Sequence, residues 1–324
     1  MRPTPRVSVI MPCYNVQDFL SECLNSVLNQ SFKDFEIICI EDCSTDNTKE
    51  ILKQYAKKHK NIRLVCNSSN QGLAISRNTG INESCGEYIY FLDSDDTISP
   101  DCLQKLYDEI CKNNCDVVVG SVKVYPDNSQ DSLLVERAQW LQNWINFKPI
   151  TTLQIDENNA DDYYNSIYCC AVNKLYKRDY LLNNDIYFIN KNCYHEDNGF
   201  WLKILTCNPV ISAISEVTYF YRIRNNSIIY KARSNKKTHL SDLTASLFDA
   251  LTFAKTKNNA PLANFIYYDI YRLKPYRLFY LVWTKFEKRL KLFMCPIFRL
   301  KFYPDTSKFK LNLLGIPVFI WRKK

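Results

Sequence analysis

Short, uncharged hydrophobic stretches alternate with amphipathic stretches along the first part of the chain. The hydrophobic stretches predict buried strands at residues 7–11, 35–40, 62–66 and 88–92. The amphipathic stretches predict helices near residues 19–28, 48–58, 73–83 and 103–111. Strands that alternate with helices in this way predict right-handed crossovers and an α/β fold, with a mainly parallel sheet covered by helices on both faces.

The pattern is less regular after this part. Residues 117–122 predict a further buried strand, the chain resumes near residue 168 with residues 168–176, and residues 217–220 predict another strand. Between them, residues 126–160 are rich in Asp, Asn and Gln, which predicts a variable insertion.

Acidic residues follow the strand that ends at Leu92. Asp93, Asp95 and Asp96 come directly after it. Crowded carboxylates repel one another unless a cation lies between them, and oxygen ligands suit Mg²⁺ or Mn²⁺, which also bind phosphate oxygens. The cluster therefore predicts a divalent metal site. A polar turn in which Asp93 or Asp96 caps the helix near Pro100 accounts for the same residues.

The polar loops that follow parallel strands emerge at one edge of the sheet, where ligands of such folds bind. We therefore expect Asp42, Arg77 and the acids Asp93 and Asp95 to lie near one another. Neither the Gly-x-Gly-x-x-Gly pattern nor the Gly-x-x-x-x-Gly-Lys-Ser/Thr pattern follows any of these strands. This excludes ordinary dinucleotide-dependent dehydrogenases and P-loop ATPases.

Composition and charge add two constraints. The chain has 324 residues and 14 cysteines, none in a Cys-x-x-Cys pair, and its first residues lack a signal-type apolar stretch, so we expect a reducing cytoplasm and no structural zinc. The net charge is +8, yet residues 271–324 carry fourteen Lys or Arg against two acids. The basic character therefore belongs to the C-terminal tail.

Residues 276–294 of this tail show apolar and aromatic positions at helical spacing, opposite Lys and Arg. We expect residues 231–324 to form a helical, basic extension. Its amphipathic helix would either bind an anionic membrane surface in the interfacial plane or pack on the preceding domain. No nucleic-acid motif accompanies it, so no nucleic-acid partner is expected.

Five ordered blocks resemble the family 2 glycosyltransferases of the GT-A fold. The blocks are residues 7–15, residues 34–46, residues 70–80, the Asp-x-Asp motif Asp93-Ser94-Asp95 and the later pair Glu196-Asp197. The resemblance covers about residues 5–230, and the order of the blocks is more specific than any one of them. One departure is Cys43, where the family generally has a glycine.

The resemblance implies an inverting, metal-dependent hexosyltransferase. It would transfer a hexose or N-acetylhexosamine from a UDP-sugar to a hydroxyl of a glycan or lipid-linked acceptor, in bacterial polysaccharide or lipopolysaccharide synthesis. Residues 1–230 would form the catalytic domain, with the nucleotide bound by residues 1–125 and the acceptor by residues 126–230. With its basic tail, the protein would work in the cytoplasm, peripherally on the inner face of the cell membrane.

The resemblance also assigns roles to single residues. Asp95, with Asp93 beside it, would hold Mn²⁺ or Mg²⁺, and Asp197 would be the general base. Donor-binding roles would fall to Pro12, Tyr14, Asn15, Asp42, Arg77, Asp93, Ser94 and Arg222.

Each role has an alternative on the residues alone. Glu196 and Asp197 also suit the cap of a helix, Arg77 could pair with Asp42 or Asp46 at the surface, and Arg222 with Arg224 could form a solvated face. For the whole protein, the alternative is a non-catalytic relative that binds nucleotide sugars as a scaffold in a glycan assembly complex.

Overall fold

The fold is that of a computed structural model, which describes residues 4–145, 169–225 and 236–272 and five strands between residues 280 and 322. The chain divides into two compact units, Met1–Tyr267 and Tyr268–Lys324. The first unit contains the sheet with the polar loops, and it extends past residue 230. The second contains most of the basic tail.

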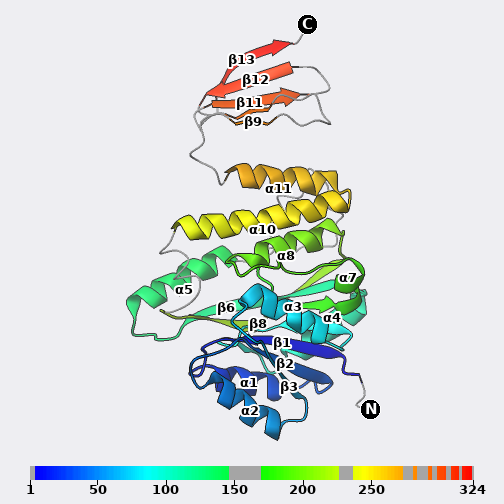
Figure 1. The fold of residues 1–324 in the computed structure, drawn as a ribbon, viewed down its shortest axis with the longest axis vertical. Helices are drawn as coiled ribbons and strands as arrows, with labels where there is room; N and C mark the ends of the chain where they lie inside the picture. The colour runs from blue at the N-terminus through cyan, green and yellow to red at the C-terminus, as the bar shows by residue number, and fades with distance from the viewer. Residues whose placement is uncertain are drawn as a thin grey trace. The chain divides into compact units, whose positions relative to one another are not determined.

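The first unit is built on a mixed sheet (Figure 1). Its described strands are β1 (Val7–Cys13), β2 (Phe35–Glu41), β3 (Ile62–Cys66), β4 (Tyr88–Phe91), β5 (Thr97–Ile98), β6 (Val117–Pro126), β7 (Lys174–Lys177) and β8 (Ile211–Ile223). They lie in the order β3-β2-β1-β4-β7-β6-β8-β5. The first four pair in parallel, as predicted, and β7 is antiparallel to β4 and β6.

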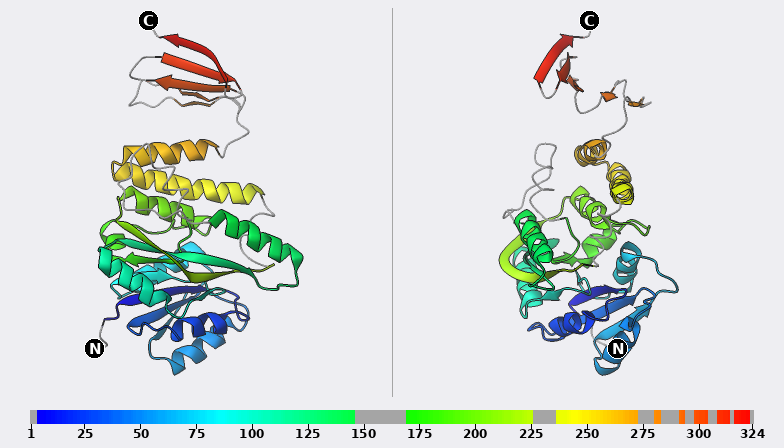
Figure 2. Two further views of the ribbon diagram at one scale, coloured as in Figure 1. Left: turned by 180° about the vertical axis from the view of Figure 1, so that it is seen from behind. Right: turned by 90° about the vertical axis from the view of Figure 1, so that its left-hand side faces the viewer.

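Helices cover this sheet. The described helices of the first unit, with α11 crossing into the second, are α1 (Leu20–Leu28), α2 (Thr48–Lys58), α3 (Leu73–Glu83), α4 (Cys102–Asn113), α5 (Ser132–Ile145), α7 (Arg178–Asn183), α8 (Glu196–Thr206), α10 (Lys236–Thr256) and α11 (Ala260–Arg272). Figure 2 shows α10 lying along α8. A hydrogen bond from Gly199 N on α8 to Ser246 Oγ on α10, 2.9 Å long, joins these two helices.

Helix α3 packs closely on β1, the fully buried central strand. Gly80 permits this approach, because a Cβ at that position would lie 2.2 Å from Cγ2 of Ile10. The buried face of α3 is unusual in that it includes Ser76 and Arg77 beside apolar residues. The close packing at Gly80 thus accompanies the burial of two polar side chains of α3, Ser76 and Arg77.

The predicted insertion over residues 126–160 contains a helix. Helix α5 packs through Ala138 and Leu141 against Val124 of β6. Gln142 bonds the same strand through its side chain, accepting from Val124 N at 2.8 Å and donating to Val122 O at 3.2 Å. Residues 146–168, which hold the rest of the insertion, lie outside the described residues. Of the stretch over residues 168–176, residues 169–176 are described, and its last three residues belong to β7.

The predicted helix over residues 276–294 is wrong wherever the structure describes that segment. Residues Tyr280–Val282 and Lys291–Phe293 form strands β9 and β10 of an antiparallel sheet. Three more strands complete it: β11 (Phe298–Tyr303), β12 (Lys308–Leu313) and β13 (Ile316–Arg322). Aromatic and β-branched residues favour strands, and β11 and β12 alternate apolar with basic residues at the period of two that typifies a sheet.

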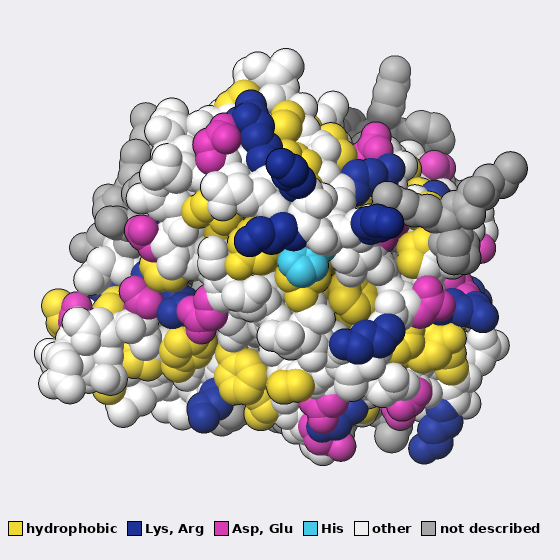
Figure 3. Space-filling model, turned by 90° about the horizontal axis from the view of Figure 1, so that it is seen from below, with side chains coloured by type: hydrophobic (Ala, Val, Ile, Leu, Met, Phe, Trp, Pro, Cys, Tyr) yellow, Lys and Arg dark blue, Asp and Glu magenta, His cyan; other side chains and the backbone are white. Residues whose placement is uncertain are grey.

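None of the described helices combines the length and apolar character needed to span a membrane. Figure 3 views the molecule from below, the side on which α1 and α2 lie in Figure 1. Basic, acidic and apolar side chains are interspersed over that face. Such mixing is typical of a solvated surface.

Candidate active site

The acidic turn after β4 is bonded to the loop after β1. Ser94 donates a 2.8 Å hydrogen bond from its buried hydroxyl to Pro12 O, and Asp96 N donates to Asp93 O at 3.1 Å. Neither Asp93 nor Asp96 is the cap of the following helix, because α4 begins after Asp101. The capping alternative for this cluster is therefore wrong.

Arg77 joins the acidic turn to the first turn of α8. Its Nη2 donates to Asp93 Oδ1 at 2.8 Å, and its Nη1 donates to Glu196 Oε1 at 2.8 Å and Asp197 Oδ1 at 2.6 Å. The side chain is 1% exposed. Burial alone would lower the pKa of Arg77, but the charges of Asp197, Asp93 and Glu196 outweigh it and raise this pKa. The alternative surface pairing with Asp42 or Asp46 is therefore wrong.

Glu196 and Asp197 begin α8 but do not cap it. The N-cap position is His195, in the left-handed region at φ 64°, and it makes no side-chain capping bond. The pKa of Glu196 is raised to about 8, first by burial and then by the charge of Asp197. Burial also raises the pKa of Asp197, against the attraction of Arg77 and Lys174. The carboxyl groups of this pair therefore take up protons more readily than exposed ones.

Asp95 and Asp96 face the end of β8. Asp95 Oδ2 accepts a 2.7 Å bond from Arg224 Nε. Asp96 is buried and accepts from the hydroxyl of Tyr219 at 2.6 Å and from Arg222 N at 2.7 Å. Burial, followed by the charges of Asp95 and Asp93, raises the pKa of Asp96 well above its usual value.

The contacts of the Arg222 side chain are internal. Its Nη1 and Nη2 bond Asp127 at 2.9 Å and Glu22 at 2.5 Å, and the guanidinium lies between the rings of Phe19 and Tyr125. Its Nε donates to Asp95 O at 2.9 Å. Arg224, rather than Arg222, thus reaches a carboxylate of the Asp-x-Asp motif.

Asp42 organises the loop between β3 and α3. Its Oδ1 accepts from Asn67 Nδ2 at 2.7 Å and Gln71 N at 2.8 Å, and its Oδ2 accepts from Gly72 N at 2.8 Å. Gly72 has φ 88°, which favours glycine. Asn67 also donates to the hydroxyl of Ser76, the neighbour of Arg77, at 3.2 Å. Asp42 and Arg77 are therefore linked through the loop rather than paired.

The loops after β1 and β2 are bonded to each other. Asn15 Oδ1 accepts from Thr45 N at 2.8 Å, and Asn15 N donates to Ser44 Oγ at 3.2 Å. Tyr14 is 46% exposed beside them. Cys43 adopts φ 58°, a conformation that a glycine would take without strain.

Asp93 and Asp95 are the residues that the family resemblance assigns to a divalent cation. Each uses one carboxylate oxygen toward an arginine, Arg77 or Arg224. Among the described residues, no group of three or more His, Cys, Asp or Glu side chains is arranged to hold a metal ion. Mg²⁺ and similar ions commonly take one or two carboxylates and complete their shell with substrate phosphates and water. The two carboxylates fit a cation that arrives with a diphosphate.

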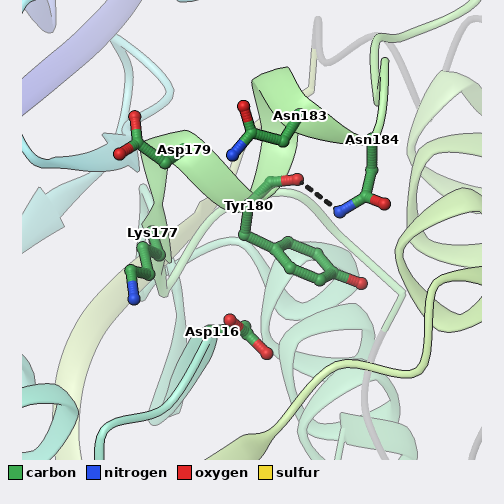
Figure 4. Close-up of a pocket in the computed structure, with 6 residues that line it drawn as sticks. All are labelled: Asp116, Lys177, Asp179, Tyr180, Asn183 and Asn184. Carbon is green, nitrogen blue, oxygen red and sulfur yellow. Dashed lines mark hydrogen bonds between the residues drawn. The ribbon is translucent and has the colours of Figure 1, made fainter.

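A separate hollow of about 360 Å³ lies beside α7 (Figure 4). Its lining residues are Asp116, Lys177, Asp179, Tyr180, Asn183 and Asn184. Strands β4 and β6 are both antiparallel to β7, so they run in the same direction. The start of β6 and the end of β4 therefore lie at opposite ends of the strands. The hollow is at the edge where β6 begins, and it is not part of the candidate site.

The model of the family described as "Glycosyl transferase family 2" matches residues 8–183 of the chain. The chain belongs to this family. The family 2 resemblance of its sequence blocks is therefore confirmed.

Curated relatives of this family 2 chain come from several bacteria. It is 32% identical to the glycosyltransferase TuaG of Bacillus subtilis over 235 residues, which cover 72% of this chain and 86% of TuaG. It is 29% identical to the poly(ribitol-phosphate) beta-glucosyltransferase of Bacillus spizizenii over 252 residues, 75% of this chain. The chain spans 37% of the length of that relative and 63% of the glycosyltransferase EpsJ of B. subtilis.

Solved structures show the fold of this family 2 chain. Residues 1–349 of S. aureus TarS in complex with UDP align with a TM-score of 0.55 at 21% identity, over 89% of this chain and 96% of that chain. The mannosyltransferase PcManGT from Pyrobaculum calidifontis, solved with GDP-Man and Mn²⁺, aligns with a TM-score of 0.52 at 18% identity, over 85% of this chain and 82% of that chain. The predicted GT-A α/β fold is confirmed.

Proposed function

We propose that the chain is an inverting glycosyltransferase that transfers a hexose or N-acetylhexosamine from a UDP-sugar to a hydroxyl of a glycan acceptor in cell-surface polysaccharide synthesis. One observation carries the proposal: Asp93, from the Asp-x-Asp turn, and Asp197, on α8, bond to the same buried guanidinium of Arg77. A carboxylate for the donor and a carboxylate for the acceptor are thereby held at one edge of the sheet.

The choice of donor rests on relatives. TarS of S. aureus, named a poly(ribitol-phosphate) beta-N-acetylglucosaminyltransferase, is 32% identical to this chain over 223 residues, and its residues 1–349 have been solved with UDP and with UDP-GlcNAc. The B. spizizenii relative is named a glucosyltransferase on the same kind of polymer. Uridine donors and polymeric acceptors are therefore our first choice for this chain.

The reaction needs a base on one side of the sugar and charge neutralisation on the other. Asp197 accepts the proton of the acceptor hydroxyl while its oxygen bonds to the anomeric carbon opposite the leaving group, which inverts that centre. The bond from this carbon to the diphosphate breaks, and its electrons leave with UDP. A divalent ion, Mn²⁺ or Mg²⁺, held by Asp93 and Asp95 would supply Lewis-acid neutralisation of the diphosphate.

The loops after β1 and β2 suit the nucleotide. Tyr14 is the exposed aromatic side chain available to cover a base, beside Pro12 and Asn15. Ser94 holds the turn against Pro12 O, and Asp42 has capacity for one further hydrogen bond, since a carboxylate offers about four acceptor sites. Arg222 would act on the donor indirectly, through the Asp95 backbone that it bonds.

The test is UDP release from a panel of UDP-sugars, with a polyol-phosphate or glycan acceptor and Mn²⁺, together with UDP-induced thermal stabilisation. Asp197→Asn should lower turnover by about 100-fold or more while UDP still stabilises the protein. Asp108→Asn, an exposed carboxylate on α4, is the matched control. Full activity of Asp197→Asn would refute the base assignment. Stabilisation by UDP with no turnover of any sugar would favour the scaffold alternative.

We also propose that the basic tail binds an anionic membrane surface. The support is its charge, fourteen Lys or Arg against two acids, and the alternation of basic and apolar residues along β11 and β12. Lys301 and Lys310 are cross-strand neighbours in register. Lys301→Glu with Lys310→Glu should weaken sedimentation with phosphatidylglycerol vesicles but not the background with neutral vesicles, and unchanged sedimentation would refute the proposal.

A further inference from the structure

Arg77 is held by carboxylates from two elements other than its own. The arginine lies on α3, Asp93 follows β4, and Glu196 and Asp197 begin α8, so its partners are as far as 120 residues away in sequence. Its Nη1 is shared by two carboxylates and its Nη2 bonds a third. The guanidinium therefore contacts both the donor carboxylate and the base of the proposed reaction.

A direct contact between Arg77 and the donor diphosphate does not fit this geometry. The side chain is 1% exposed, and both terminal nitrogens already donate to carboxylates. Its Nε is buried without a hydrogen-bond partner among the described residues, which shows how closely the surroundings enclose it. A phosphate that took the place of the present acceptors would have to displace these carboxylates from a side chain that is almost fully buried.

An aromatic platform lies against the guanidinium. Arg77 lies over the ring of Phe188, with 5.3 Å between Cζ and the ring centroid. Phe188 in turn stacks on Phe200 of α8, with ring centroids 3.9 Å apart and planes inclined by 5°. The planar fork of an arginine directs its N–H groups at fixed angles to its carboxylate partners, a geometry that a lysine could not reproduce.

The next residue of α3 holds this platform in place. Asn78 Nδ2 donates to Phe188 O at 3.0 Å, and Asn78 Oδ1 accepts from Phe188 N at 2.8 Å. Both backbone polar groups of Phe188 are thus bonded to one side chain. Arg77 and Asn78 together attach the chain around Phe188 and the start of α8 to α3.

We propose that Arg77 is a positioning residue for the transfer reaction, with Asn78 as its support. It acts through Asp197 and Asp93, by holding the base at a fixed place relative to the donor carboxylate, and it does not bind the donor. This proposal rests on the proposed function, because it takes Asp197 as the base. A displacement of about 1 Å in a catalytic group can cost about 100-fold in rate.

Steady-state kinetics and UDP binding by calorimetry on the full chain test this role. Arg77→Lys keeps the charge and loses the fork, so kcat should fall by about 100-fold while the Kd for UDP stays within about twofold. Asn78→Ala keeps Arg77 and loosens Phe188, and it should lower kcat by about 10-fold with the same unchanged Kd. Arg178→Lys is the matched control, since the Arg178 side chain donates a 3.2 Å bond from Nε to Ser84 Oγ, away from the site.

The outcomes separate the two proposals. If Arg77→Lys weakened UDP binding 10-fold with kcat retained, Arg77 would be a donor ligand and the positioning role would be refuted. If Arg77→Lys does not fold, Asn78→Ala decides, and a kcat within about twofold of wild type refutes the role. If Asp197→Asn were fully active, the proposed function would lose its base, whatever the arginine variants did.

Discussion

Glu196→Gln should remove a pH dependence from the stability of the protein. Glu196 is buried at the start of α8, where it shares the Nη1 group of Arg77 with Asp197. Glutamine has nearly the same shape and can still accept from Arg77, but it cannot ionise. The substitution therefore removes the ionisation of Glu196 and leaves its packing nearly unchanged.

The magnitude follows from the pKa. Burial, then the charge of Asp197, raises the pKa of Glu196 from 4.5 to about 8. The folded state therefore binds this proton more tightly than the unfolded chain, so the stabilisation is complete below pH 4.5 and is lost as the pH rises through about 8. Integration from pH 6 to pH 8 gives a loss of about 2 kcal/mol of unfolding free energy in wild type that the Gln variant does not show.

Urea unfolding at pH 6 and pH 8, at one ionic strength, measures this difference. With an m value of about 3 kcal/mol/M, the wild-type midpoint should fall about 0.7 M further than the midpoint of Glu196→Gln. Glu50→Gln, an exposed carboxylate on α2, is the control and should follow wild type. If the midpoints of wild type and Glu196→Gln moved in parallel, Glu196 would be ionised at both pH values, and the assignment of its proton would be refuted.

Three further predictions concern other parts of the site. Asp95→Asn should abolish Mn²⁺-stimulated UDP release, because it removes a carboxylate from the proposed cation site, and normal stimulation in a Mn²⁺ titration would contradict that site. Gly72→Ala should lower the free energy of unfolding by about 1–3 kcal/mol, since φ is 88° and the new Cβ would lie 2.3 Å from Asn192 Oδ1; a loss below about 0.5 kcal/mol in urea unfolding would count against it. Arg222→Lys should cost about 1–3 kcal/mol by the same measurement, because two carboxylates lose their guanidinium partner, and an unchanged midpoint would mean that these ion pairs contribute nothing.

Local pattern was enough to predict the first half of the sheet. Strand β3 and helices α2 and α3 have the bounds that the sequence pattern predicted. The strand after residue 168 was harder: β7 has only four residues, and its antiparallel pairing with β4 depends on a long connection. Strand direction in such a case is a tertiary property.

The sequence predicted which residues form the site better than it predicted their hydrogen-bond partners. The blocks identified Arg77, Asp93 and Asp197, but nothing local to Arg77 indicates that its partners lie 16 to 120 residues away. Tyr219, which donates to Asp96, and Asn78, which holds Phe188, had no signal beyond their positions in matched or hydrophobic segments. In the tail, apolar residues at helical spacing coexisted with alternation at period two, and the strands that form follow the second pattern.

The two hydrogen bonds between the Asn78 side chain and the Phe188 backbone also bear on how such an enzyme could be re-engineered. With the bond from Arg77 to Asp93, these contacts join α3 to the turn after β4 and to the chain that leads into α8. The bond between Gln142 of α5 and Val124 of β6 involves other residues. A segment such as α5 could therefore be exchanged between relatives to change the acceptor of the proposed enzyme, while the contacts around Arg77 keep their positions.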